Sequence, residues 1–182
     1  MARLYLVRHG RAAAGIAENT DPGLDELGHR QAAATAEELA ALPVMPLFTS
    51  PLLRARETGE PLARRWNQQL TVESRVAEIP FPTSDLAERA RWLQAVMPGR
   101  WSSLDDYWQQ WRNDVVACLL EQPRDCIFFS HFIAINAAVG AACADDRMVV
   151  FRPDNASITV LSNDPGSLTL LQLGGEAETK VN

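Results

Sequence analysis

Two histidines stand where two apolar strands are expected to end. His9 follows Arg8 and the apolar run 3–7, and His131 follows the apolar run 126–130. If the two strands are parallel, their carboxyl ends lie at one edge of a sheet, where open α/β sheets bind ligands. A neutral imidazole can attack phosphorus, and a second imidazole can donate hydrogen bonds to the charged group under attack. The alternative is that each histidine is only structural.

A second arginine is expected near the same edge. Arg54 lies in the first turns of a helix that the pattern predicts over residues 51–66. Arg8 and Arg54 would then approach one crevice. Two guanidinium groups suit a phosphoryl group, because its peripheral oxygens each accept several hydrogen bonds. The alternative for Arg54 is an exposed helix face, because other arginines follow it.

The elements that would position these residues alternate between strand and helix. This order is typical of a three-layer α/β/α sandwich, in which a mostly parallel central sheet has helices on both faces. Capping residues, prolines and apolar spacing predict helices at 26–42 (capped by Asp25), 51–66, 84–97, 104–121 (capped by Ser103) and 132–143. Strands are expected at 3–7, 47–50, 70–72, 126–130, 148–151, 157–161 and 167–173, with some antiparallel pairing among the last three.

Length and composition favour one ordinary globular domain over residues 1–182. Of the 182 residues 47% are hydrophobic and 22% are charged, and the formal net charge is −6. Nucleic-acid binders are more often basic, and no apolar run reaches the roughly 20 residues of a membrane span. The first ten residues also lack the apolar stretch of an export signal. We therefore expect a cytoplasmic protein without nucleic-acid or membrane partners, and the oligomeric state stays open.

The cysteines and histidines do not suggest a metal site or a cofactor. Cys118, Cys126 and Cys143 are odd in number, do not form a C-x-x-C motif and lie in apolar stretches. We expect all three to be buried free thiols in a reducing compartment. The chain has only three histidines and no cluster of histidine with cysteine, so we expect no bound metal.

The motifs together resemble a known family. Leu6-Val7-Arg8-His9-Gly10 resembles the Arg-His-Gly signature of the histidine phosphatase superfamily, the phosphoglycerate mutase-like proteins. Further similar segments occur in the family's order at 21–32, 50–58, 129–131 and 155–158. The short chain is most similar to the small phosphatases of that family. The resemblance implies the phosphoglycerate mutase-like fold described above.

The resemblance also implies roles for the matched residues. His9 would be the nucleophile that becomes phosphohistidine, and Arg8, Arg54 and His131 would form the phosphate pocket. His131 would in this way take part in catalysis as well as binding. Neighbouring arginines would lower the pKa of His9 and favour its neutral, attacking form.

Two implied residues depart from the family's pattern. Glu78 falls where the family has its general acid and base, but Pro80 follows where glycine is common, and Glu73 is a competing candidate. Phe132 follows His131 where the family usually has glycine. Its backbone N–H can still bind phosphate, although a positive φ at this position would strain it.

The sequence says less about the residues that would bind the leaving group of the substrate. Residues 79–112 would form a small helical cap insertion over the pocket, and they contain four of the five tryptophans. Trp108 and Trp111 share a helix face, so they either pack the cap onto the sheet or form an aromatic wall for the substrate. Arg11 either contacts a second anionic group of the substrate or is an exposed loop arginine.

The interpretation that these features favour is a metal-independent phosphatase that hydrolyses phosphomonoesters of small molecules through phosphohistidine on His9. A positive pocket would supply the charge stabilisation that magnesium supplies in other enzymes. A phosphoglycerate mutase and a protein phosphohistidine phosphatase are the alternatives with the same chemistry. A non-catalytic protein that binds phosphorylated ligands fits less well, because Arg8, His9, Arg54 and His131 are all present.

Overall fold

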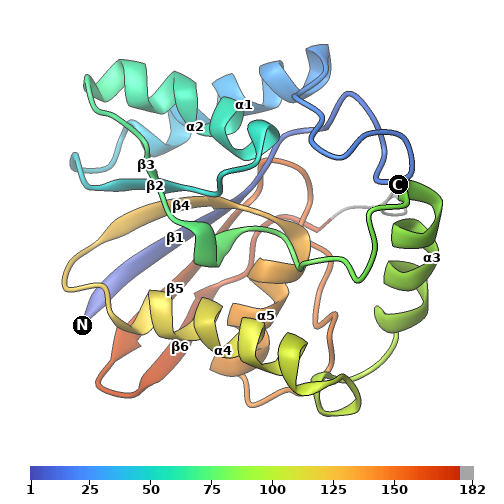
Figure 1. Cartoon of the computed structure of the whole chain (residues 1–182). Coiled ribbons are helices and arrows are strands. Elements are labelled where there is room, and N and C mark those ends of the chain that lie inside the picture. Colours follow the sequence, from blue (N-terminus) through green and yellow to red (C-terminus); the bar gives the residue numbers. More distant parts are fainter. Residues whose placement is uncertain (177–182) are drawn as a thin grey trace.

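A six-stranded sheet forms the centre of the computed structural model, which describes residues 1–176 (Figure 1). The strands are Ala2–Arg8 (β1), Leu47–Thr49 (β2), Thr71–Val72 (β3), Cys126–Ser130 (β4), Ile158–Asp164 (β5) and Ser167–Gln172 (β6). They lie in the order β3-β2-β4-β1-β5-β6. The first four are mutually parallel, whereas β5 runs antiparallel to both β1 and β6. The expected mostly parallel sheet is confirmed.

The central strand β1 is buried on both faces, which explains why its sequence is a continuous apolar run. Leu4 and Leu6 belong to one hydrophobic core, and Tyr5 and Val7 belong to another on the opposite face. Successive side chains of a strand point to opposite faces, so β1 holds the two cores together. Its parallel pairing with β4 continues to the last residues of both strands, so the residues that follow them meet at one edge.

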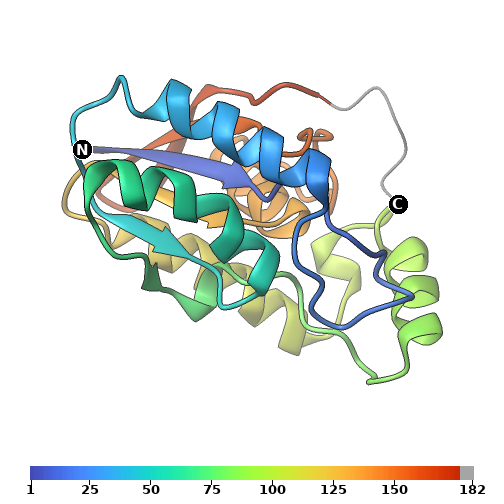
Figure 2. The same cartoon turned by 90° about the horizontal axis from the view of Figure 1, so that it is seen from above.

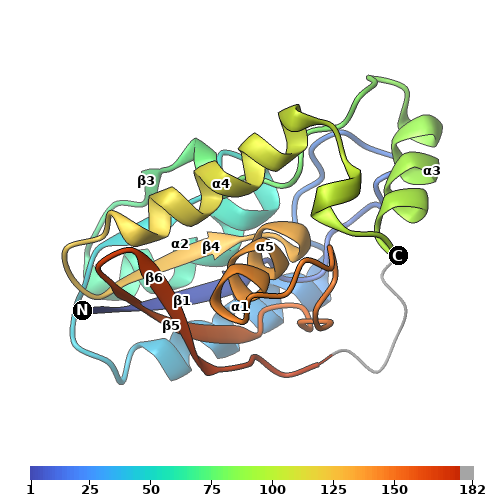
Figure 3. The same cartoon turned by 90° about the horizontal axis from the view of Figure 1, so that it is seen from below.

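Four helices cover the two faces of the sheet and complete the three expected layers. The helices α1 (Glu26–Leu39) and α2 (Leu53–Trp66) lie on one face (Figure 2). The helices α4 (Asp106–Leu120) and α5 (Phe132–Ala142) lie on the other (Figure 3). Asp25 caps α1 through its side chain, as its position in the sequence predicts.

Residues 79–112 lie mainly beyond the carboxyl ends of the parallel strands (Figure 1). They include the helix α3 (Leu86–Val96), the short 3-10 helix η2 (Trp101–Ser103) and the first turns of α4; another 3-10 helix, η1 (Ser74–Val76), precedes them. A third hydrophobic cluster joins this segment to the start of α5.

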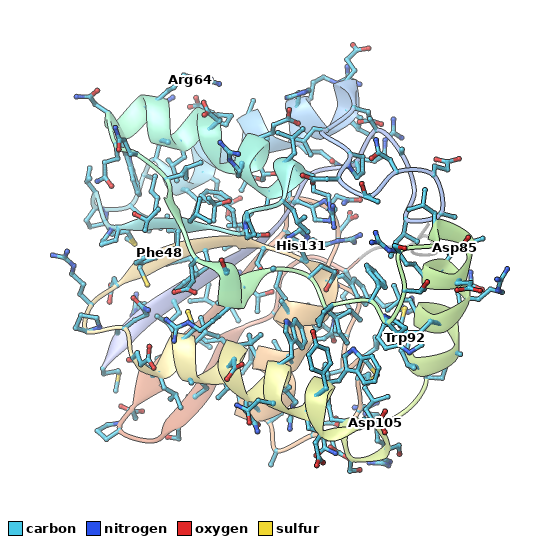
Figure 4. The ribbon with its side chains drawn as sticks, in the orientation of Figure 1. Phe48, Arg64, Asp85, Trp92, Asp105 and His131 are labelled. Atoms are coloured by element: carbon cyan, nitrogen blue, oxygen red, sulfur yellow. The ribbon has the colours of Figure 1, made fainter. Side chains whose placement is uncertain are left out.

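The tryptophans of this segment belong to that cluster. Trp92 lies on the side of α3 that faces α4, with its ring centroid 5.1 Å from that of Trp108 (Figure 4). Trp101 is fully buried and stacks on Trp111 at 5.8 Å. Of the two interpretations of the tryptophans, the structure therefore supports packing.

Residues 148–151 do not form the expected strand. The side-chain oxygen of Asn136, in α5, accepts hydrogen bonds from the backbone N–H groups of Val150 and Phe151. The N–H of Met148 donates to the Gly99 carbonyl. These donors are satisfied by a side chain and a loop carbonyl, so the segment needs no strand partner despite its apolar sequence.

The other elements differ from expectation mainly at their ends. The helix α2 begins at Leu53 rather than at residue 51, and Asp105 rather than Ser103 precedes α4 as its N-terminal cap residue. The strand β5 continues to Asp164, because its antiparallel pairing with both neighbours runs past residue 161.

One of the three cysteines is placed differently from the prediction. Cys118 and Cys126 are buried free thiols, but Cys143 is exposed, because it lies at the C-terminal end of α5 where the apolar run reaches the surface. Among the described residues, none of the helices combines the length and the apolar character that a bilayer crossing needs.

Candidate active site

The carboxyl edge of the sheet brings the two strand-end histidines together. His9 follows β1, and His131 follows β4 and stands at the N-terminus of α5 (Figure 4). Their ring centroids are 5.2 Å apart. Arg8 ends β1 and Arg54 lies in the first turn of α2, so both reach the same place. The four residues that the sequence singled out for phosphate chemistry thus share one site.

Two hydrogen bonds fix the proton on the His9 ring. Nδ1 of His9 lies 2.7 Å from the carbonyl oxygen of Gly10, which can only accept, so Nδ1 carries the hydrogen. Nε of Arg54 lies 3.2 Å from Nε2 of His9, and a guanidinium can only donate. Nε2 therefore holds a lone pair. This is the tautomer that a nucleophilic imidazole needs.

Burial and charge keep His9 in this neutral form. Burial is the main cause that holds the pKa of His9 well below its usual value, and the nearby Arg54 and Arg8 lower it further. The same causes, together with His9 itself, hold the pKa of His131 well below its usual value. Both imidazoles are therefore neutral near pH 7.

The backbone around His9 is held by several neighbours. Thr58 Oγ1 accepts a hydrogen bond from the Gly10 N–H at 3.0 Å, and Asn155 Nδ2 donates to the His9 carbonyl at 3.1 Å. A Cβ atom on Gly10 would lie 2.6 Å from the carbonyl oxygen of Gly28 at the start of α1. Only glycine lets the loop after His9 pack this closely against α1, which explains the glycine that follows His9.

Two of the buried side-chain nitrogens without a hydrogen-bond partner belong to His131 and Arg8. His131 is fully buried; its Nε2 lies 2.7 Å from Ser50 Oγ, but its Nδ1 has no hydrogen-bond partner. Arg8 donates through Nη1 to the Pro153 carbonyl at 2.8 Å, while its Nε has no partner. Buried polar groups without partners cost free energy that a bound ligand can return. Nε of Arg8 can only donate and therefore suits an anion, and Nδ1 of His131 does so in the tautomer whose Nε2 accepts from Ser50.

Phe132 adopts the helical backbone of the first residue of α5, so the strain considered for a positive φ does not arise. Its N–H belongs to the first turn of the helix, where backbone donors and the helix dipole favour anions. Its ring also lies beneath the Arg8 guanidinium, 5.2 Å from ring centroid to Cζ. A bulky residue is thus compatible with an anion-binding helix end.

The structure places Glu78 and Glu73 in different surroundings. Glu78 is half-buried, lines the same cavity as His9, and accepts hydrogen bonds from the N–H groups of Ile79 and Ile133, at 3.0 and 3.2 Å. Burial raises the pKa of Glu78, although those N–H groups, Arg54 and Arg8 act in the opposite direction. Glu73 instead pairs with Arg75 at 2.8 Å, mainly through hydrogen bonds that lower its pKa. Only Glu78 has the geometry of an acid at the site.

A cavity of about 520 Å³ opens over this site. Its base includes Arg8, His9, Arg54, Glu78 and Phe132, and its outer part lies between the loop 12–22 and α3. Arg11, Trp108 and the fully buried His131 do not line it. Arg11 forms an ion pair with Asp25, and Trp108 Nε1 donates to the Pro80 carbonyl at 2.9 Å.

Several functional positions carried no assigned role at the level of sequence. The His131 ring contacts Ser50, and the backbone at His9 and Gly10 is hydrogen-bonded by Asn155 and Thr58. These three partners lie within motifs that the family resemblance already marks. Asp21 lies 3.9 Å from Arg54 and also accepts the Leu53 N–H at the start of α2. Across residues 1–176, no group of three or more histidine, cysteine or acidic side chains is arranged to hold a metal ion.

The chain belongs to the histidine phosphatase superfamily (branch 1), whose sequence profile matches residues 4–175. A probable phosphoglycerate mutase of Photorhabdus laumondii is 27% identical over 159 residues, which cover 77% of this chain and 74% of that protein. The 2,3-bisphosphoglycerate-dependent phosphoglycerate mutase of Thermoplasma acidophilum is 24% identical over 179 residues, covering 91% and 90%.

Solved structures show the same fold. A mycobacterial glucosyl-3-phosphoglycerate phosphatase in complex with VO3 matches with a TM-score of 0.75 and 21% identity, over 97% of this chain and 100% of that chain. A phosphoserine phosphatase of Entamoeba histolytica in complex with 3-phosphoglyceric acid matches with a TM-score of 0.72 and 21% identity, over 96% and 98%. The expected α/β fold of this family is confirmed.

The proximity of Arg54 to His9 gives a prediction about the pKa of His9. Replacing Arg54 with methionine removes one of the cations that lower the pKa of His9, so this pKa should rise. Nitrogen-15 NMR of the His9 ring across a pH titration measures the shift. The control is Arg56→Met, an exposed arginine of the same helix, which should leave the titration unchanged. An unchanged His9 titration in Arg54→Met would contradict the electrostatic account.

Proposed function

We propose that this protein is a phosphatase that hydrolyses phosphomonoesters of small molecules through a phosphohistidine on His9 and without a metal ion. The observation that carries the proposal is the lone pair of His9 Nε2, held beside Arg54 in the cavity that also contains Glu78. A nucleophile, cationic donors and a proton donor are the groups that phosphoryl transfer requires.

In the first step, Nε2 of His9 attacks the phosphorus atom. The N–P bond forms as the bond between phosphorus and the ester oxygen breaks. Glu78, whose protonated form is favoured because burial raises its pKa, gives its proton to the departing oxygen. The hydrogen bond from Nδ1 to the Gly10 carbonyl stabilises the positive charge that the ring acquires.

In the second step, water hydrolyses the phosphohistidine. Glu78 is now a carboxylate and takes a proton from the water, whose oxygen bonds to phosphorus as the N–P bond breaks. Inorganic phosphate leaves, His9 regains its lone pair, and Glu78 is again protonated. The step therefore restores the starting protonation of both residues, as a catalytic cycle requires.

The charge of the phosphoryl group is balanced by the protein in this proposal. Arg8 and Arg54 supply guanidinium donors, Nδ1 of His131 is an unpartnered ring nitrogen, and Phe132 supplies a helix N-terminus. Donors that are already oriented in a buried site stabilise developing charge without reorganisation. These groups take the part that magnesium plays in other phosphoryl-transfer enzymes.

The mycobacterial and Entamoeba proteins with this fold are named as phosphatases of small phosphorylated metabolites, which supports that substrate class. The two sequence relatives named as phosphoglycerate mutases favour a second candidate, transfer of the phosphoryl group between phosphoglycerates. Both activities share the phosphohistidine. They differ in whether water or a second substrate accepts the phosphoryl group.

The proposal is tested by phosphate release from para-nitrophenyl phosphate and from a panel of metabolite esters, in the presence of a strong chelator. Wild type should turn over, and His9→Ala should not, because the nucleophile is missing. The free energy of unfolding should change by no more than about 1–2 kcal/mol, since the replaced ring is not part of a core cluster. His29→Ala, at the exposed third histidine, is the matched control and should remain active.

Each result that departs from these expectations bears on a different part of the proposed function. Turnover by His9→Ala would exclude the phosphohistidine mechanism. Loss of activity in chelator that magnesium restores would exclude metal independence. Isomerisation of phosphoglycerates without release of phosphate would favour the mutase.

Glu78→Gln tests the acid role. It should slow the first step about 10²–10⁴-fold for alkyl phosphates, which need a proton on the leaving oxygen, and far less for para-nitrophenyl phosphate. Rapid-quench measurement of alcohol release in the first turnover isolates that step. The first-turnover rate on alkyl esters should fall as pH rises through the raised pKa of Glu78, and the glutamine variant should lack this fall.

Glu73→Gln is the matched control, because Glu73 pairs with Arg75 outside the cavity. It should leave the leaving-group dependence unchanged. Equal slowing of both ester types by Glu78→Gln would move the acid role to another group.

A further inference from the structure

The outer part of the cavity is mostly apolar, which bears on the leaving group. One wall is the loop after His9, whose residues 12 and 14–16 are small or apolar, whereas Asn19, Thr20 and Asp21 further along the loop are polar. The blue trace of this loop lies beside α3 in Figures 1 and 2. A volume of about 520 Å³ falls in the range of small-molecule sites and holds much more than a phosphoryl group.

The opposite wall is one face of α3. Arg89, Ala90, Leu93, Gln94 and Met97, the last just past the helix end, line the cavity. Their spacing places them on the same side of the helix. Arg89 is therefore a cation among the mostly apolar lining residues of α3. It belongs to a different element from Arg8 in β1 and Arg54 in α2.

The Arg89 guanidinium is held in place without being neutralised. Its Nε donates to the Thr83 carbonyl at 3.0 Å, and its Cζ lies 5.2 Å from the centroid of the Phe81 ring. Neither partner is a carboxylate, and the neighbouring Glu88 accepts from Thr83 Oγ1 instead. Within residues 1–176 no acidic side chain forms an ion pair with Arg89, and its two Nη groups are left for a ligand.

Arg11, which the sequence offered for a second anionic group, has no such freedom. It lies outside the cavity and pairs with Asp25. Arg8 and Arg54 are at the base with His9, where the phosphoryl group would bind. Arg89 is left as the cation of the outer cavity.

We propose that Arg89 binds an anionic group at the far end of the leaving group, and that an apolar spacer separates this group from the phosphoryl oxygen. The inference rests on the proposed phosphatase function and specifies its substrate class. A half-buried guanidinium without a carboxylate partner favours an anion, and the apolar walls favour hydrocarbon between the two charged ends. A carboxylate and a second phosphoryl group share the required chemistry.

The test uses alkyl phosphates of four to eight carbons that end in a carboxylate, a phosphonate or a neutral carboxamide. The terminal group is remote from the reacting oxygen, so it scarcely changes the leaving-group reactivity. For wild type, kcat/KM should be about tenfold higher for an anionic ester than for the amide of equal length. The carboxylate and phosphonate series show which anion is preferred.

Arg89→Met should remove this preference and leave kcat/KM for the amide and for para-nitrophenyl phosphate unchanged. Arg91→Met is the matched control, since Arg91 is exposed on the same helix and does not line the cavity. Arg91→Met should keep the higher kcat/KM for anionic esters. A merely structural role of Arg89 would instead lower kcat/KM for all esters alike.

The outcomes separate the inference from the proposed function. Equal kcat/KM for anionic and neutral esters in wild type, or a preference that survives in Arg89→Met, overturns the role of Arg89 but leaves the phosphatase intact. A uniform loss on all esters in Arg89→Met also overturns that role. No turnover of any ester by wild type, para-nitrophenyl phosphate included, overturns both.

Discussion

The hydrogen bond from His9 Nδ1 to the Gly10 carbonyl is the constraint on which the account of this site depends. It places the ring hydrogen on the inner nitrogen, so the lone pair of Nε2 is left for the cavity and for Arg54. The bond exists because β1 ends at Arg8 and the next residues turn tightly against α1, where a side chain at residue 10 would collide with Gly28. The sheet, the glycine contact and the tautomer are thus parts of one arrangement.

The electrostatics of the site follow from burial as much as from charge. Burial is the main cause of the lowered pKa of His9 and of the raised pKa of Glu78, and the arginines then lower both. A base with a lowered pKa and an acid with a raised pKa favour the same uncharged state, which is the combination that the proposed first step needs. The unpartnered Nε donor of Arg8 leaves the site short of an anion, and a phosphoryl group would supply it.

Much of the fold and of the base of the site follows from the sequence by short-range reasoning. The apolar runs before His9 and His131 require strands buried on both faces, and parallel pairing then brings their ends together. The strand expected at 148–151 is wrong because the side chain of Asn136 satisfies its backbone donors, which no periodicity records. The contacts of Arg11 with Asp25 and of Trp108 with the Pro80 carbonyl were not predictable for a similar reason, since tertiary packing sets these partners. Arg89 gave no signal at all, because its place in the cavity depends on how α3 stands against the loop after β1.

In the proposed mechanism the phosphoryl group passes through Nε2 of His9. The most direct test of this mechanism is to quench turnover in alkali, in which phosphohistidine persists, and to locate the phosphoryl group by peptide mass spectrometry and NMR. Glu78→Gln with para-nitrophenyl phosphate suits this experiment, because this ester needs little help from an acid in the first step, while the second step lacks the base that activates water. We expect to find the phosphoryl group on Nε2 of His9. Phosphoryl on another residue, or repeated turnover with none trapped on His9, would contradict the proposed mechanism.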